Sequence, residues 1–143
     1  MSTGPEARQE PPECASTIDQ TEPAAADCPF DLQSLLDRCL GDGEFCRTLM
    51  GKFTLRAAEV LAGLDRAANA HSAGEMAGLA HEIKGLAANF SADNLRFWAG
   101  ALECAVRGGN SAQLRPLVGK VRAETERCIR AVPRMLQRLA ESQ

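Results

Sequence analysis

The sequence contains no tyrosine, one tryptophan and no alternating run of valine, isoleucine and threonine, the residues that favour β-strands. Alanine, leucine, arginine and glutamate are frequent instead, and apolar residues recur at the three- and four-residue steps of amphipathic helices. A length of 143 residues suits one domain of ordinary size. We therefore predict an all-α fold, an antiparallel four-helix bundle with a short additional N-terminal helix.

Positive charge is not in excess, because 16 basic residues stand against 19 acidic ones and the net charge is -3. Proteins that bind nucleic acid usually concentrate basic charge, so we expect no nucleic-acid partner. No stretch approaches the roughly 20 apolar residues of a membrane span, and no apolar segment typical of a signal peptide is present. We expect a cytoplasmic protein with no membrane partner.

Six cysteines are present, but no CxxC pair and no cluster of cysteine with histidine, which argues against a zinc site. A phosphate-binding loop of the GxxxxGK[ST] type is also missing, so binding of ATP is not expected. We predict no bound metal and no cofactor. In the cytosol the thiols would be reduced, and four of them would pack in or beside the core: Cys39, Cys46, Cys104 and Cys128.

The first part of the chain differs in composition from the rest. Residues 1–28 are rich in proline and small polar residues, which predicts a disordered leader or linker, and residues 29–143 would form the helical domain. Asp31 is placed to cap a short first helix, which Gly41-Asp42-Gly43 would end. The apolar residues of that helix are Leu32, Leu35, Leu36 and Leu40.

Four longer amphipathic helices are predicted, over about 43–69, 73–90, 95–107 and 111–140. The apolar face of the first of these begins with Phe45, Leu49 and Phe53. Ser72 and Glu75 have the spacing of a capping box at the start of the second. Pro133 should kink or divide the last.

One of only two histidines, His81, lies nearly opposite the apolar stripe of the predicted helix 73–90. Small residues share its side of the helix: Gly74, Ala77, Gly78, Gly85 and Ala88. Glycine inside a helix costs about 1 kcal/mol relative to alanine, so the two nearest glycines need a reason. We interpret them as giving a bulky partner access to the imidazole. The alternatives are an ordinary exposed histidine and glycines that serve close helix packing.

A solvent-facing imidazole has a pKa near 6.5, so much of it is neutral at pH 7 and carries a nucleophilic lone pair. Lys84 lies three residues further along, on the adjacent helix surface, where its ammonium can pair with a phosphoryl group carried by His81. Gly85 would leave room for the phosphoryl oxygens and for an incoming protein. The other histidine, His71, is predicted to be an incidental residue of an interhelical turn.

The run His81-Glu82-Ile83-Lys84-Gly85 is followed by Ala87-Ala88-Asn89-Phe90, Ala92, Leu95 and Leu102-Glu103. In these residues the sequence resembles the histidine-containing phosphotransfer (HPt) domain family of two-component phosphorelays. At the level of pattern the resemblance spans residues 30–140. The family usually has glycine ten positions after the histidine, where this chain has Ser91.

The resemblance implies a phosphocarrier rather than an autonomous enzyme. His81 would be the phosphoryl acceptor and donor, Lys84 the residue that stabilises the phosphoryl charge, and Gly85 the residue that keeps the site open. Its partners would be response-regulator receiver domains, which bring the Mg²⁺, and a hybrid sensor histidine kinase. We expect the carrier to be a monomer.

Two other functions remain open from the sequence. The chain could be a helical-bundle adaptor that binds a receiver or kinase without being phosphorylated. It could also be the substrate domain of a chemotaxis-type histidine kinase, phosphorylated directly from ATP by a catalytic domain that these 143 residues do not contain.

Overall fold

The structure is a computed structural model that describes residues 28–141, over which five helices and no strand are formed. The helices are α2 (Leu32–Arg38), α3 (Gly43–Asn69), α4 (Ala73–Asn89), α5 (Asp93–Arg107) and α6 (Ser111–Glu141). The all-α prediction is confirmed, and each long helix begins and ends within a few residues of its predicted bounds. The predicted leader lies outside the described residues, apart from Cys28.

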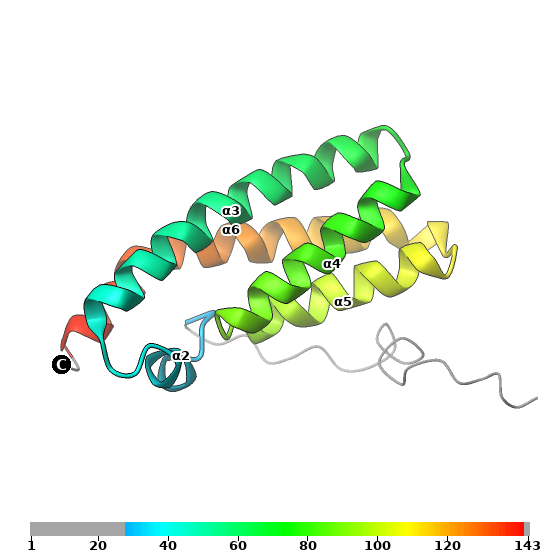
Figure 1. The fold of residues 1–143 in the computed structure, drawn as a ribbon. Coiled ribbons are helices and arrows are strands. Elements are labelled where there is room, and N and C mark those ends of the chain that lie inside the picture. Colours follow the sequence, from blue (N-terminus) through cyan, green and yellow to red (C-terminus); the bar gives the residue numbers. More distant parts are fainter. Residues whose placement is uncertain (1–27, 142–143) are drawn as a thin grey trace, which may run out of the picture.

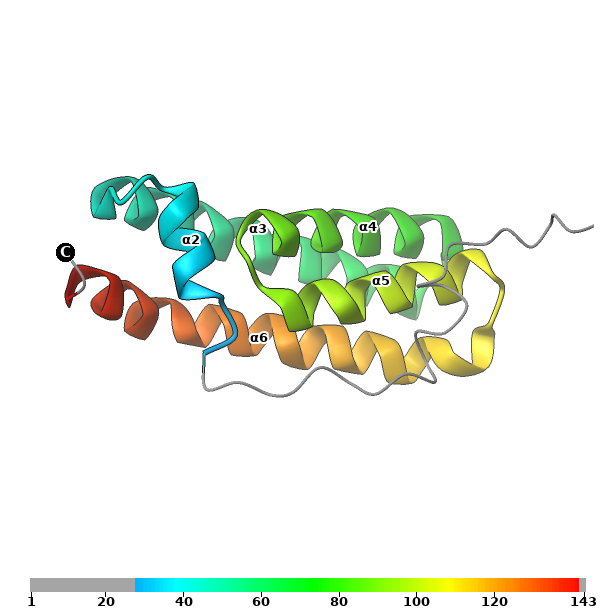
Figure 2. The same ribbon diagram turned by 90° about the horizontal axis from the view of Figure 1, so that it is seen from below.

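Helices α3 to α6 run alternately up and down and form the predicted antiparallel four-helix bundle (Figure 1). Each helix packs against its neighbours in the chain, and α3 closes the bundle against α6. Because α3 and α6 are much longer than α4 and α5, one end of α3 and one end of α6 extend past the shorter helices. The short α2 lies across these protruding ends and contacts both of them (Figure 2).

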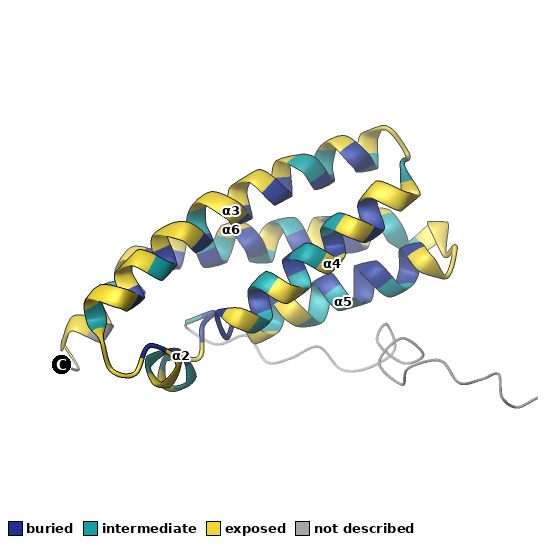
Figure 3. Ribbon diagram, viewed as in Figure 1, coloured by how far each residue is buried: buried dark blue, intermediate teal, exposed yellow. Residues whose placement is uncertain are grey.

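The buried residues line the inner faces of the four long helices, and the outer faces are exposed (Figure 3). Phe53 of α3 lies at the end of the core near α2, where its ring centroid is 5.4 Å from that of Phe30 and 5.1 Å from that of Phe90. Burying an aromatic side chain of this kind contributes about 1.5–3 kcal/mol. This aromatic cluster joins the segment before α2 to the turn between α4 and α5.

Several helices end in the same tight hydrogen-bond pattern, the Schellman motif. At the end of α4, Ala92 donates its N–H to the Ala87 carbonyl at 2.9 Å, and Ser91 donates to Ala88 at 3.4 Å. The pattern requires a left-handed residue after the helix, and here that residue is Ser91, with φ of 59°. The same position is taken by Leu40 after α2 and His71 after α3.

Two predicted core positions are wrong. Leu40 is 90% exposed, because α2 ends at Arg38 and the left-handed conformation of Leu40 turns its side chain away from the bundle. Phe45 is 48% exposed, because the buried face of α3 begins one residue later, at Cys46, and continues through Met50. At this end of α3 the residues that face the core are therefore Cys46 and Met50, and not Phe45.

The predicted capping box at the start of α4 is also wrong. Ser72 is the N-cap residue, but its side chain makes no capping hydrogen bond. In a capping box the Glu75 carboxylate would accept the N–H of Ser72, yet that N–H already donates to the Ala67 carbonyl at 2.9 Å. The end of α3 therefore uses the donor that the box needs.

Helix α6 is continuous from Ser111 to Glu141, although it contains Pro116 and Pro133. Of the two effects expected of Pro133, a kink or a division of the helix, division does not occur. None of the described helices is both long enough and apolar enough to cross a membrane.

The cysteines differ from one another in their oxidation state. Free thiols are found at Cys28, Cys39, Cys46 and Cys128, and the last three are buried, as predicted. Cys104 is disulfide-bonded, so the expectation of a reduced thiol is wrong at that position. Within residues 28–141 no group of three or more His, Cys, Asp or Glu side chains is placed to hold a metal ion.

Candidate functional site

His81 lies in the middle of α4 and its side chain is 66% exposed. Two nearby residues of the same helix, Ala80 and Ile83, are 0% and 1% exposed and point into the bundle. Because α4 is an outer helix that packs on α3 and α5, the remaining side is free to carry a polar group. The imidazole is therefore accessible to another protein.

Glu103 of α5 lies beside the imidazole. His81 Nδ1 is 3.1 Å from Glu103 Oε2 and 3.3 Å from Oε1. The two residues are 22 positions apart, and Ala92, the N-cap residue of α5, lies midway between them in the sequence. Antiparallel helices joined by a short turn bring such residues to the same level, so the helical hairpin itself places the carboxylate against the ring.

The Glu103 carboxylate is ionised in this setting. Its side chain is only 12% exposed, and this burial acts to raise the pKa. Hydrogen bonds from Arg107 and His81, and the charge of Lys84, act in the opposite direction and together hold the pKa of Glu103 below its ordinary value. Arg107 Nη2 lies 3.0 Å from Oε2.

An ionised carboxylate accepts hydrogen bonds and donates none, so the hydrogen between the two groups belongs to His81 Nδ1. In the neutral ring this fixes the tautomer, and Nε2 carries the available lone pair. Among the described residues no hydrogen-bond partner is found for Nε2. The geometry thus presents one defined nucleophilic nitrogen to solvent.

Lys84 lies next to the same carboxylate. Its Nζ is 3.6 Å from Glu103 Oε1, and its side chain is 36% exposed. A Cβ on Gly100 of α5 would lie 3.4 Å from Lys84 Cδ, so the lysine stem lies over α5 at this glycine. The ammonium is therefore held near the imidazole by Glu103 and by the surface of α5.

The glycines around His81 are not needed for packing among residues 28–141. A Cβ placed on Gly74, Gly78 or Gly85 would meet nothing within 4 Å. Close packing against another helix therefore does not explain them. Ala77 is different: it was expected on the open side but is only 5% exposed, because α4 is covered on two sides by α3 and α5.

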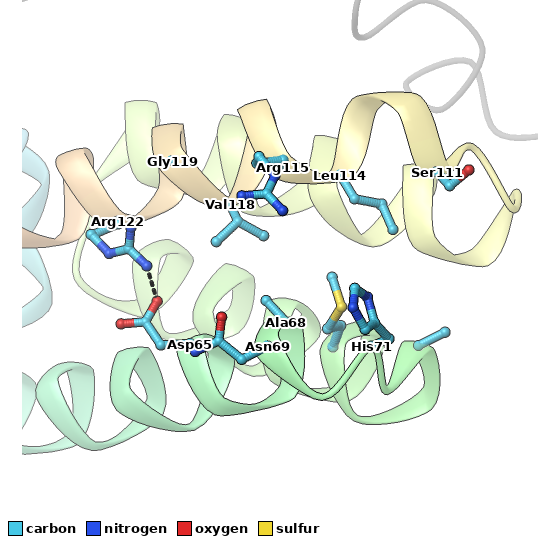
Figure 4. Close-up of a pocket in the computed structure, with 12 residues that line it drawn as sticks. Asp65, Ala68, Asn69, His71, Ser111, Leu114, Arg115, Val118, Gly119 and Arg122 are labelled. Carbon is cyan, nitrogen blue, oxygen red and sulfur yellow. Dashed lines mark hydrogen bonds and ion pairs between the residues drawn. The ribbon is translucent and has the colours of Figure 1, made fainter.

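The structure also contains a cavity of about 640 Å³ between α3, the start of α4 and α6. His71 lines it, together with Asn69 and Arg115, and an ion pair joins Arg122 to Asp65 at one side (Figure 4). No residue of α5 contributes to this cavity, and it includes none of the residues clustered around His81. The two histidines therefore occupy separate places in the bundle.

The comparison with known families agrees with this arrangement. A family model described as the Hpt domain matches residues 48–142, which is well over half of the chain. The chain belongs to the Hpt domain family. Nothing matches it among curated proteins or among solved structures.

Membership of this family implies a phosphotransfer-related role in two-component signalling. Hpt domains are phosphocarrier modules rather than catalysts, and they interact with receiver domains and kinases. The helical bundle seen in this Hpt domain is the fold that the family assignment requires.

Ser91 gives a physical reason for the glycine that the family usually has ten positions after the histidine. The residue has φ of 59°, a conformation in which glycine has no steric cost. In this Hpt domain Ser91 is only 5% exposed, and its hydroxyl donates to the Ser34 hydroxyl at 2.9 Å. Its carbonyl also accepts the N–H of Asp31 at 2.8 Å. The serine therefore ties the turn after α4 to the start of α2.

Sequence reasoning assigned no chemical role to Glu103 or Arg107. Glu103 was noted only as part of the family pattern. The signal that could have found Glu103 is positional: once a short turn is predicted near Ala92, the residue level with His81 on the next helix follows directly. Arg107 then lies one turn beyond Glu103 on the same helix.

Proposed function

We propose that this protein is a histidine phosphotransfer carrier in which His81 accepts a phosphoryl group from, or donates it to, the aspartate of a receiver domain. The observation that carries the proposal is the pairing of His81 Nδ1 with the ionised Glu103 carboxylate, which leaves Nε2 as the exposed nucleophile. The family assignment agrees with it at the level of phosphotransfer in two-component signalling.

The proposed transfer is a displacement at phosphorus. The Nε2 lone pair of His81 forms a bond to the phosphorus of the receiver's aspartyl phosphate, and the bond from phosphorus to the aspartate oxygen breaks. The aspartate leaves as a carboxylate, and the imidazole ring gains positive charge while keeping its Nδ1 hydrogen. Glu103 stabilises that charge because its carboxylate lies 3.1 Å from Nδ1. The reverse reaction uses the same contacts.

Lys84 and Gly85 have supporting roles in this proposal. The Lys84 ammonium balances the charge of the phosphoryl oxygens, and its partial exposure leaves it able to turn from Glu103 towards them. Gly85 has no side chain one turn after His81, and a Cβ placed there would meet none of the described residues within 4 Å. This side of the imidazole is therefore left free for a receiver domain.

The partner would supply the rest of the chemistry. We place the Mg²⁺ on the receiver domain, whose carboxylates are the hard oxygen ligands that this ion prefers. A hybrid sensor histidine kinase would be the upstream source of the phosphoryl group, and the carrier itself would use no cofactor.

The test is phosphotransfer from a receiver domain carrying labelled aspartyl phosphate. Acid-labile label should appear on the wild-type chain and be absent from His81→Gln. The matched control is His71→Gln, because His71 is the only other histidine and should be dispensable. Label that persists on His81→Gln would contradict the proposal.

The same experiment separates the alternatives. Stable binding of the receiver with no transferred label would indicate an adaptor. If label arrives only from ATP in the presence of a kinase catalytic domain, and never from a receiver, the chain is a kinase substrate domain instead.

A further inference from the structure

Two cysteines at the corner between α2 and α3 have their sulfur atoms in contact. Cys39 Sγ lies 2.6 Å from Cys46 Sγ, about half an ångström beyond the roughly 2.05 Å of a covalent disulfide. The two residues are seven positions apart and flank the turn that joins the helices. Both are free thiols, and their exposed fractions are 1% and 0%.

The surrounding backbone fixes this contact. Cys39 is the C-cap residue of α2, and its N–H donates to carbonyls of the helix's last turn. Asp42 is the N-cap residue of α3, with its side chain accepting the N–H groups of Glu44 and Phe45. Cys46 follows in the first turn of α3, where its N–H donates to the Asp42 carbonyl at 3.0 Å. A disulfide therefore needs only a small inward movement of two side chains.

We propose that Cys39 and Cys46 are an oxidation site that forms a reversible intramolecular disulfide. With hydrogen peroxide as the oxidant, one thiolate attacks a peroxide oxygen and becomes a sulfenic acid, releasing water once the departing hydroxide takes up a proton. The second thiol attacks that sulfur and displaces a second water molecule. In total two thiols and one peroxide give one disulfide and two waters, and a dithiol reductant restores the thiols.

The disulfide would fasten a weakly held element. Helix α2 has only seven residues, and it packs against α3 and α6. Its other described ties both involve Ser91, whose carbonyl accepts the N–H of Asp31 and whose hydroxyl donates to the Ser34 hydroxyl. Such short terminal elements open locally at low cost, and a bond at the α2–α3 corner removes that freedom.

Oxidation is expected to be slow. Burial, together with the neighbouring Cys39, raises the pKa of the Cys46 thiol to about 12, so its thiolate is scarce at neutral pH. The reaction therefore depends on opening of the corner, and we expect it over minutes to hours rather than seconds.

The positions of the trypsin cleavage sites allow a direct test for this disulfide. Trypsin cleaves after Arg38 and Arg47 and leaves both cysteines on one peptide, residues 39–47. The folded full chain is treated with hydrogen peroxide, its free thiols are alkylated, and the chain is digested with trypsin. The mass of the peptide 39–47 is then measured by mass spectrometry. We expect a peptide that is lighter than the dithiol form by two hydrogen atoms and carries no alkyl group. Two alkylated thiols, a link to any other cysteine, or sulfinic acid on either residue would overturn the proposal.

A stability measurement gives a second readout. Oxidation should raise the Tm of the wild-type chain above that of its reduced form by on the order of 5 °C more than it does in Cys46→Ala. Because Cys104 is disulfide-bonded, comparison with the variant removes the contribution of that bond. Cys39→Ala should behave like Cys46→Ala, and an equal Tm gain in the wild type and both variants would contradict the proposal.

Discussion

At His81 the two ring nitrogens have different surroundings. Nδ1 faces the Glu103 carboxylate of α5, and the rest of the ring is open to solvent. The Glu103 carboxylate accepts hydrogen bonds from Arg107 and His81 and lies close to the positive charge of Lys84. These contacts explain why it stays ionised although it is largely buried. The exposed histidine, its lysine and its small neighbours could be predicted from one helix, whereas the carboxylate needed the pairing of two helices.

Replacing Glu103 by glutamine should change how stability depends on pH. The pKa of Glu103 is lower in the folded protein than its ordinary value, so its contribution is complete above about pH 4.3 and is lost as the pH falls through the folded-state pKa. Urea unfolding between pH 7 and pH 3 should show the wild type losing stability relative to Glu103→Gln at the acidic end.

Arg107→Gln provides the matched comparison for that measurement. It removes the hydrogen bond that lowers the pKa of Glu103 most, so the acid-dependent part of the stability should shrink. A difference between wild type and Glu103→Gln that does not vary with pH would contradict the assigned ionisation.

A substitution at Gly85 should change stability and phosphotransfer in opposite directions. Gly85→Ala should stabilise the isolated protein by about 0.5–1 kcal/mol, because a Cβ meets nothing there and alanine favours the helix. It should also slow phosphotransfer at least tenfold, because the new methyl group stands where the receiver must approach. Thermal unfolding and transfer kinetics measure the two effects.

The control for Gly85→Ala is Gly51→Ala on α3, another open glycine inside a helix. It should give a similar gain in stability and leave transfer unchanged. If Gly85→Ala is equally harmless to transfer, the interpretation of this glycine as an access residue is wrong.

At the scale of the helices, the length of each element was well predicted from its periodicity and its turns. The ends of the helices were harder to predict, because three of the residues that follow helices in the left-handed conformation are not glycine: Leu40, His71 and Ser91. Sequence rules for helix ends look for glycine or asparagine, so they misplace Leu40 in the core. The tight turn after α3 also occupies the N–H that a capping box at Ser72 would use.

Leu40 and Ser91 have similar backbone conformations but different surroundings, which allows a paired prediction. Leu40→Gly should stabilise the protein by about 1 kcal/mol, because it relieves the left-handed strain and the leucine it removes is 90% exposed. Ser91→Gly relieves the same strain but loses the hydrogen bond to Ser34, worth roughly 1 kcal/mol, so its net effect should be near zero. Denaturant unfolding tests both, and a destabilising Leu40→Gly would contradict this account.

At the scale of the whole molecule, three separate features occupy separate places in the bundle. The His81 cluster lies on α4 and α5, the cavity beside His71 lies between α3 and α6, and the Cys39–Cys46 pair lies at the α2–α3 corner. The four-helix architecture could be predicted from sequence, because amphipathic helices joined by short turns have few ways to bury their stripes. The cavity could not be predicted, since it depends on how α3 and α6 meet, which are far apart along the chain. The sulfur contact could not be predicted either, since it depends on the detailed geometry of the α2–α3 turn.

The central claim is that His81 carries the phosphoryl group on Nε2 while Glu103 holds the hydrogen of Nδ1. Nitrogen-15 NMR of the histidine side chains, recorded before and after phosphotransfer from a receiver domain, tests it most directly. We predict that the neutral form of the His81 ring carries its hydrogen on Nδ1 before transfer, and that phosphorus couples to Nε2 of His81 afterwards, with His71 unchanged. Phosphorus coupled to Nδ1 of His81, or to either nitrogen of His71, would contradict the account.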